Sequence, residues 1–113
     1  MRVFYLHWNE IECKARTKEL RAERHTVRGH WSTTEHAALK DALPDVLVIS
    51  LDRLPSHGRE VAEWLWEAKK RQHIPIVFEG GTADKVAATR AAFPRAVYCN
   101  TGEVSAVLRR LKA

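Results

Sequence analysis

Short apolar runs alternate with amphipathic stretches along the 113-residue chain, and the two kinds of segment have different hydrophobic periods. The short runs are typical of buried β-strands, and the longer stretches repeat their apolar residues at the 3.6-residue spacing of a helix. Turn residues and helix-capping residues separate them. The pattern predicts five strand–helix pairs.

The predicted strands share a short apolar or β-branched composition and lie at residues 3–6, 25–29, 45–50, 74–78 and 96–99. The run at 45–50 is apolar on both faces, as a central strand of a helix-covered parallel sheet must be. The weak run at 25–29 is typical of an edge strand.

The predicted helices begin at capping residues. Asn9 caps a helix to about Arg24, Thr33 or Thr34 caps one that ends near Leu43, and Ser56 caps a third. A fourth helix follows the turn at residues 80–82 and runs to about Phe93, and the last carries an apolar stripe at Val104, Val107, Leu108 and Leu111.

Strict alternation with short connections predicts an α/β fold, because parallel strands need crossover helices that cover both faces of the sheet. We predict one domain over residues 1–113, a doubly wound, flavodoxin-like five-stranded sheet of order 2-1-3-4-5. Ligands of such sheets bind at the carboxyl ends of the strands. The polar or cleft-lining candidates there are His7, Trp8, Asn9, Glu10, Ser50, Asp52, His57, Glu79, Gly80, Gly81, Asn100 and Thr101.

Composition narrows the function classes. The formal charge is +5, and no apolar run approaches the ~18 residues of a membrane span. We therefore expect a cytoplasmic protein without membrane contact. Cys13 and Cys99 are far apart in sequence, and the six histidines lack the spacing of metal ligands, so we expect no disulfide framework, metal or cofactor.

Residues 44–58, PDVLVISLDRLPSHG, resemble the pattern P-D-[apolar]4-D-L-x-L-P-x-x-x-G of response-regulator receiver domains. Residues 74–78 look like the fourth strand of that family, 96–98 like its fifth, and 16–27 like its first helix and second strand. The resemblance covers essentially the whole chain. It implies the same fold and a role in signal transduction in a two-component system.

The residues that phosphorylation requires in that family are replaced here. His7 and Trp8 stand where receivers carry the acidic pair that holds Mg²⁺, and Ser50 stands at the phosphoacceptor aspartate. Glu79 or Gly80 replaces the switch Ser or Thr, and residues 100–102 replace the lysine and proline after the fifth strand. Phosphoryl transfer depends on positioning and charge neutralisation, so we expect a degenerate receiver that is not an enzyme.

Two polar features leave alternatives open. Glu10, Asp52 and Glu79 could form a residual acidic site, with Asp52 meeting Glu10 across the cleft, or Asp52 could help to cap the helix near Ser56. The sequence Gly80-Gly81-Thr82 favours a turn with Thr82 as an N-cap, because it lacks the spacing of known phosphate-binding loops.

The tryptophans suggest which side chain fills the strand-end cleft and which one contacts a partner. We expect Trp8 to fill the mouth of the cleft, beside His7 and Thr101. Trp66 lies ~200° around the helix from Trp64, so one of the two is partly exposed, and Trp66 is a candidate anchor for a partner. The family resemblance implies a contact face at residues 82–111, which includes Tyr98 and Val104.

The sequence therefore favours a receiver-like signalling module that binds a protein partner or a second copy of itself without phosphorylation. One alternative is a small enzyme or ligand-binding domain that uses Glu10, Ser50, Asp52 and Glu79 in the strand-end cleft. The other is a nucleic-acid-binding regulator. Basic residues cluster around residues 16–28, 69–71 and 109–112, but no nucleic-acid-binding motif accompanies them.

Overall fold

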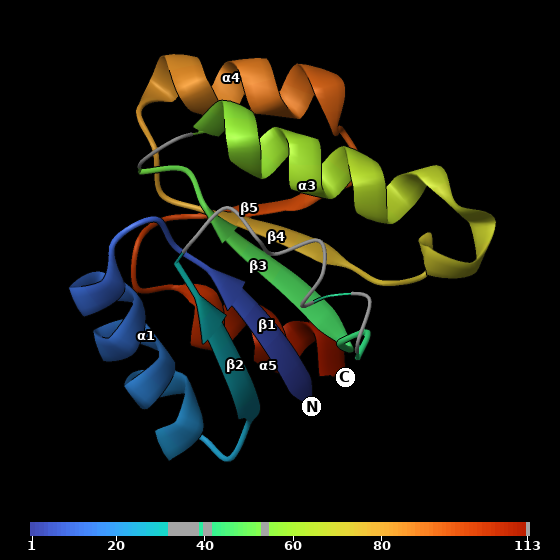
Figure 1. Ribbon diagram of the computed structural model, residues 1–113. Coiled ribbons are helices and arrows are strands. Elements are labelled where there is room, and N and C mark those ends of the chain that lie inside the picture. Colours follow the sequence, from blue (N-terminus) through green and yellow to red (C-terminus); the bar gives the residue numbers. More distant parts are fainter. Residues whose placement is uncertain (32–38, 40–41, 53–54, 113) are drawn as a thin grey trace.

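The five strands form one parallel sheet in the order β2-β1-β3-β4-β5, which confirms the predicted topology (Figure 1). The computed structural model describes residues 1–31, 39, 42–52 and 55–112. The elements are β1 (Arg2–Leu6), α1 (Glu10–Ala22), β2 (Thr26–His30), β3 (Val46–Ser50), α3 (Pro55–Glu67), η1 (Lys69–Arg71), β4 (Ile76–Glu79), α4 (Ala83–Ala92), β5 (Val97–Cys99) and α5 (Val104–Lys112).

Predicted and observed boundaries of these elements differ by at most two residues. The helix predicted from Thr33 or Thr34 to about residue 43 falls mainly outside the described residues. Within that stretch Leu39 is described, and it is helical and fully buried.

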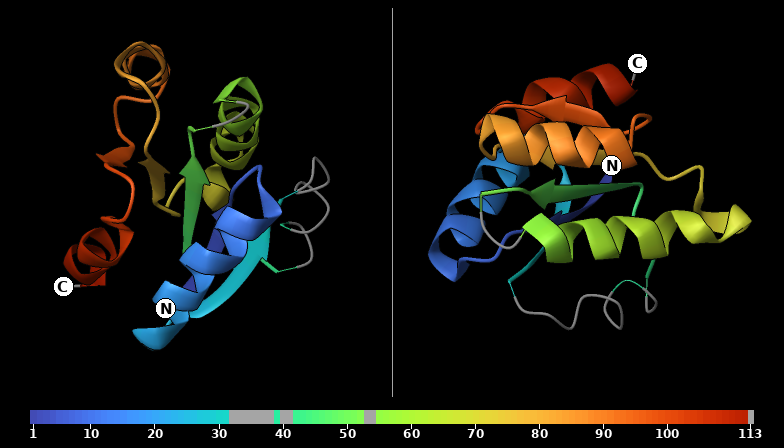
Figure 2. Two further views of the ribbon diagram at one scale, coloured as in Figure 1. Left: turned by 90° about the vertical axis from the view of Figure 1, so that its left-hand side faces the viewer. Right: turned by 90° about the horizontal axis from the view of Figure 1, so that it is seen from above.

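Helices cover both faces of the sheet, and a separate hydrophobic cluster fills each side (Figure 2). On one side, Tyr5 and Val48 from the strands pack with buried residues of α1 and α5. On the other, Phe4 and Ile49 pack with α3, and α4 contributes Val86. Successive strand residues point to opposite faces, so this alternation assigns each strand residue to one cluster.

The helix starts confirm some predicted caps and correct one. The side chain of Asn9 accepts a hydrogen bond from the Glu12 amide at 3.0 Å, as an N-cap should. The predicted cap at Ser56 is wrong, because α3 already begins at Pro55. Proline suits a first helical position, where the missing N–H costs nothing. Thr82 occupies the N-cap of α4, but its hydroxyl donates to the Asp84 carboxylate and makes no capping bond.

The layer formed by α4 and β5 is only partly covered by the rest of the described fold. β5 is an edge strand that pairs only with β4. In α4, Thr89 is the buried residue, while Ala87, Ala88 and Ala91 are exposed. No described helix combines the length and the apolar character needed to cross a membrane.

Candidate functional site

The carboxyl ends of the strands meet in register at the predicted site. Ser50 at the end of β3 pairs with Glu79 at the end of β4, and Glu79 pairs with Cys99 at the end of β5. β1 pairs with β3 along the same edge, where Leu6 faces Ile49. The sheet therefore brings the candidate residues of four strands to one place.

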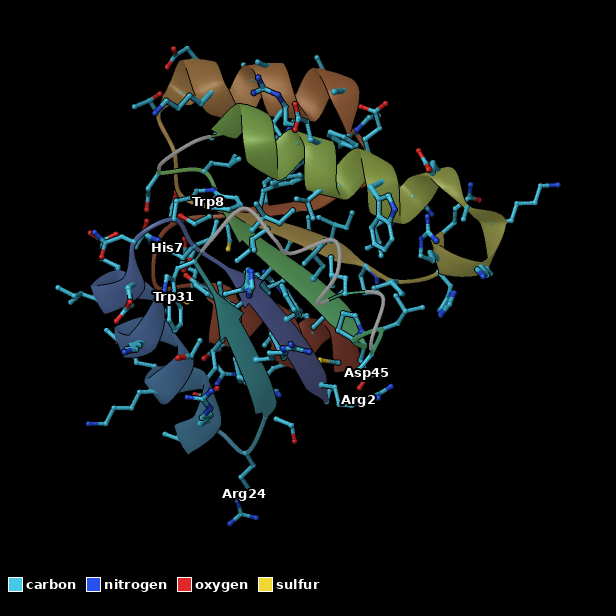
Figure 3. The ribbon with its side chains drawn as sticks, viewed as in Figure 1. Arg2, His7, Trp8, Arg24, Trp31 and Asp45 are labelled. Atoms are coloured by element: carbon cyan, nitrogen blue, oxygen red, sulfur yellow. The ribbon has the colours of Figure 1, made fainter. Side chains whose placement is uncertain are left out.

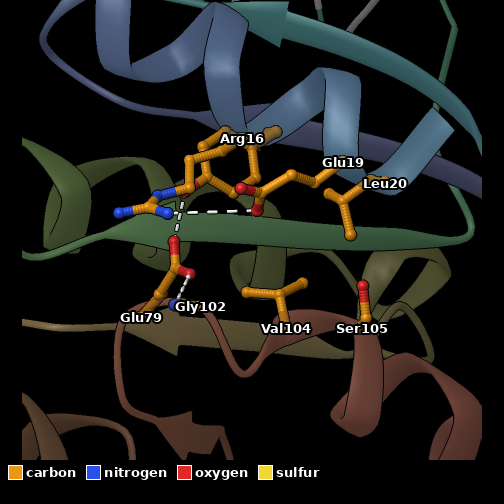
Figure 4. Close-up of a pocket in the computed structure, with 8 residues that line it drawn as sticks. Arg16, Glu19, Leu20, Glu79, Gly102, Val104 and Ser105 are labelled. Atoms are coloured by element: carbon orange, nitrogen blue, oxygen red, sulfur yellow. Dashed lines mark hydrogen bonds and ion pairs between the residues drawn. The ribbon is translucent and has the colours of Figure 1, made fainter. Parts of the chain in front are cut away.

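Glu79 is buried under this edge and has two donors (Figure 4). The Tyr5 hydroxyl donates to Oε1, and the Gly102 amide donates to Oε2 at 2.9 Å. Burial, together with the charge and hydrogen bond of Glu79, raises the pKa of Tyr5 far above its usual range, so the phenol stays protonated and donates. The hollow beside them, between α1 and α5, has a volume of about 10 Å³, and a single water needs about as much.

Ser50 cannot act as a nucleophile in this arrangement. The residue has 0% of its surface exposed, and its hydroxyl accepts a hydrogen bond from the Asp52 amide at 3.3 Å. A serine hydroxyl attacks only when a base can take its proton and a substrate can reach it. Burial denies that access.

The predicted meeting of Asp52 with Glu10 is wrong. Oδ1 of Asp52 accepts a hydrogen bond from the Gly81 amide at 2.9 Å, which ties the loop after β3 to the loop after β4. Glu10 instead pairs with Lys14 at 2.9 Å, one helical turn away. Glu79 is held by Tyr5, so the three carboxylates do not form one acidic site. Among the described residues, no group of three His, Cys, Asp or Glu side chains is placed to hold a metal ion.

His7 and Trp8 follow directly after β1, at the carboxyl end of the sheet (Figure 3). His7 is buried and stacks near Tyr5, with ring centroids 6.1 Å apart, so it shares the side that holds Glu79. Trp8 packs against the cluster on the α3 side. His7 therefore lies on the side of Tyr5, and the filling of the cleft mouth by Trp8 stays a prediction.

The hydrogen-bond partners of His7 determine which ring nitrogen carries its proton, and its burial determines its charge. Its Nδ1 accepts a hydrogen bond from the Asn9 amide at 3.3 Å, and its Nε2 lies 3.1 Å from Oε2 of Glu12. An imidazole that accepts at Nδ1 carries its proton on Nε2, where it donates to Glu12. Burial lowers the pKa of His7, although the carboxylates of Glu12, Asp52 and Glu79 oppose this shift. His7 is therefore neutral near pH 7.

This shift predicts a loss of stability in mild acid. The pKa of His7 in the folded protein lies below its usual 6.5, so the unfolded chain binds the proton first as the pH falls. The contribution of His7 is complete above pH 6.5 and is lost as the pH falls toward the folded-state pKa. We expect urea unfolding at pH 7.5 and 5.5 to show a smaller pH-dependent loss in His7→Leu than in the wild type. Equal losses in both proteins would contradict this assignment.

Backbone and side-chain bonds hold the loops after β3, β4 and β5 against one another. Besides the bonds from Gly102 to Glu79 and from Gly81 to Asp52, the Gly80 amide donates to the Cys99 carbonyl at 3.0 Å. Gly80 has a φ of +74°, and a Cβ there would lie 2.8 Å from the Thr101 hydroxyl. Thr101 is exposed in this loop cluster. The sequence did not indicate Tyr5 or Glu12 as members of the site, and it indicated Gly102 only as part of the stretch after the fifth strand.

Trp66 and Tyr98, two of the three predicted contact residues, make hydrogen bonds within the domain. The third, Val104, is buried. The Trp66 indole is partly buried and donates to the Ile74 carbonyl at 2.8 Å. Tyr98 is partly buried, and its hydroxyl donates to the Phe93 carbonyl at 2.8 Å. Val104 is only 3% exposed, so its assignment to an exposed interface is wrong: the apolar stripe of α5 faces the core.

Three of the basic side chains that favoured nucleic-acid binding make contacts within the molecule. Arg21 donates to the Val27 carbonyl, Arg71 donates to the Trp64 and Leu65 carbonyls, and Arg109 pairs with Glu23. A phosphate-binding surface needs its cations free to meet phosphate oxygens. These contacts weaken the nucleic-acid alternative.

Comparisons with known proteins find relatives in structure but not in sequence. No protein-family model matches the chain, and no curated protein sequence matches it. The signal receiver domain of a DNA-binding response regulator from Colwellia psychrerythraea superposes with a TM-score of 0.80 at 11% identity, over 98% of this chain and 97% of that one.

Two further solved structures superpose on the chain over nearly its whole length. The chemotaxis protein CheY4 of Vibrio cholerae gives a TM-score of 0.77 at 14% identity, over 98% of this chain and 95% of that one. The N-terminal domain of a response regulator receiver protein from Methanoculleus marisnigri gives 0.69 at 15% identity, over 97% and 91%. The chain therefore has the fold of response-regulator receiver domains.

Proposed function

We propose that this protein is a receiver-like signalling module that acts through protein–protein contact without being phosphorylated. The observation that carries the proposal is the state of the strand-end site. Ser50 is fully buried at the phosphoacceptor position, and the nearby carboxylates of Asp52 and Glu79 already accept hydrogen bonds from the loops around them. A phosphoryl group would find neither an exposed acceptor at position 50 nor a converging set of carboxylates for Mg²⁺.

The face formed by α4, β5 and α5 supports the contact part of the proposal. The outer edge of β5 has no neighbouring strand in the sheet, and such an edge offers unpaired backbone groups to a partner. The exposed alanines of α4 beside it form a smooth surface. The same face corresponds to the one that the family resemblance implies for partners and dimers.

The phosphorylation part is tested with a small phosphodonor. We expect no covalent change when the protein is incubated with acetyl phosphate and Mg²⁺, because no exposed carboxylate stands at the acceptor position. Intact mass spectrometry checks this, with a phosphorylatable receiver domain treated in parallel as the control. A stoichiometric gain of about 80 Da, the mass of one phosphoryl group, would overturn the proposal.

The contact part is tested with a surface variant. Ala88→Arg places a bulky charge on the exposed face of α4, whereas Ala15→Arg makes the same change on the exposed face of α1. We expect Ala88→Arg alone to abolish self-association in sedimentation analysis, or to remove a partner captured by the wild-type protein. Loss of binding in Ala15→Arg alone would place the contact elsewhere.

A further inference from the structure

A pocket of about 250 Å³ opens between α4 and α5, beside the outer edge of β5. Its wall includes Arg90 from α4 and Arg110 from α5, and the loops after β4 and β5 form its rim. It therefore lies at the carboxyl ends of two strands, where α/β sheets bind their ligands. It is separate from the buried site around Ser50 and Glu79, which the sequence had indicated as the cleft.

Neither arginine of this pocket is paired with a carboxylate of the described residues. Within the described part of the chain, neither Arg90 nor Arg110 makes a hydrogen bond or an ion pair, and Arg90 lies over the Tyr98 ring at 4.7 Å. In contrast, Arg95 donates to the Gln72 carbonyl, and Arg109 pairs with Glu23. Two guanidinium groups on one concave surface, with no carboxylate bound to either, leave their donors available to an anion.

The aromatic side chains of the lining are already packed, because Phe78 is 1% exposed and Arg90 lies over the Tyr98 ring. Phe78 and Tyr98 stack with ring centroids 5.4 Å apart and an interplanar angle of 18°, and both line the pocket. Glu103 is the one carboxylate among the lining residues, and its Oε1 accepts a hydrogen bond from the Asn100 amide. A pocket of this volume is slightly smaller than the ~300–1,000 Å³ usual for drug-sized ligands.

We propose that this pocket binds a small anion, whose carboxylate or phosphate groups are held by Arg90 and Arg110. The Cys99 thiol lines the same pocket but takes no part in charge recognition, because burial, with the nearby Glu79 and Glu103, raises its pKa to about 12. Binding here does not depend on the proposed function. A protein that accepted phosphate at the strand ends would still have this pocket.

The test is a titration of the ¹⁵N-labelled protein with citrate and with inorganic phosphate at constant ionic strength, followed by NMR. We expect saturable shifts of the Gly80, Gly81 and Asn100 amides. Arg90→Gln or Arg110→Gln should weaken citrate binding about tenfold, since a charge-assisted hydrogen bond contributes that much. Arg109→Gln is the matched control, because it removes the same charge from the next residue of α5, outside the pocket.

The outcomes distinguish a specific anion-binding site from general electrostatic attraction to a cationic surface. Equal weakening by Arg109→Gln, or shifts that do not saturate, would overturn the proposal, since both indicate general attraction to a cationic surface. A hexaglutamate peptide that binds where citrate does not would also overturn it, in favour of an acidic protein segment as the occupant. Glu103→Gln should strengthen citrate binding, because it removes the one negative charge lining the pocket.

Discussion

Tyr5→Phe is expected to lower the free energy of unfolding by about 2 kcal/mol, because it removes only the hydroxyl that donates to the buried Glu79 carboxylate. Hydrogen bonds to charged groups contribute more than neutral ones, and leaving a buried carboxylate without one of its donors costs part of its desolvation energy. The control is Tyr98→Phe, whose hydroxyl donates to a neutral carbonyl in a partly buried position. Its cost should be about 1 kcal/mol or less. Urea unfolding at pH 7.5 measures both.

The same pair can be tested by a double-mutant cycle. Glu79→Leu leaves the Tyr5 hydroxyl and the Gly102 amide without their acceptor, so we expect a loss of about 3 kcal/mol. Tyr5→Phe combined with Glu79→Leu should cost less than the sum of the two single losses, because the double variant leaves no buried hydroxyl or carboxylate unpaired. Strict additivity would show that the two side chains do not depend on each other.

The strand order and most helix boundaries could be predicted because they depend on local patterns. The doubly apolar run at residues 45–50 becomes the central strand β3, and Asn9 caps α1 as its side chain requires. The error at Ser56 is also local: Pro55 fits the first turn of a helix, so α3 begins before the predicted cap.

The contents of the site could not be predicted in the same way, because its contacts join residues that are distant in sequence. Tyr5 and Glu79 are 74 residues apart, and only the register of β1, β3 and β4 brings them together. From sequence, Tyr5 is simply an apolar strand residue, and Glu79 is one of three acids near strand ends. Which acids converge is decided by side-chain direction, and Glu10 points away toward Lys14.

The surroundings of Trp66 could not be predicted for a similar reason. The helical angle correctly separates Trp64 from Trp66, but it assumes that only one face of α3 meets protein. The chain after η1 passes beside this helix, and the Ile74 carbonyl accepts the Trp66 indole N–H. Both tryptophans are consequently partly buried against the same hydrophobic cluster. Loop paths of this kind have no periodic signal in a sequence.

Gly80→Ala is expected to lower the free energy of unfolding by about 3 kcal/mol, well above the cost of Gly102→Ala. Both glycines have positive φ, +74° and +89°, so both variants pay for the left-handed backbone, about 1–2 kcal/mol. The two positions differ in the room that they leave for a Cβ atom. A Cβ at Gly80 would lie 2.6 Å from Oδ1 of Asp52 and 2.8 Å from the Thr101 hydroxyl, whereas nothing lies within 4 Å of one at Gly102. Urea unfolding of the two variants therefore separates crowding from backbone strain.

The excess cost of Gly80→Ala reports how firmly the loops after β3, β4 and β5 are held together. If Asp52 stays bonded to the Gly81 amide, it cannot move aside, and adding Asp52→Ala to Gly80→Ala should recover part of the loss. If Gly80→Ala costs no more than Gly102→Ala, the Asp52 side chain swings away freely. The bond between these loops would then be too weak to hold the strand-end site in one arrangement.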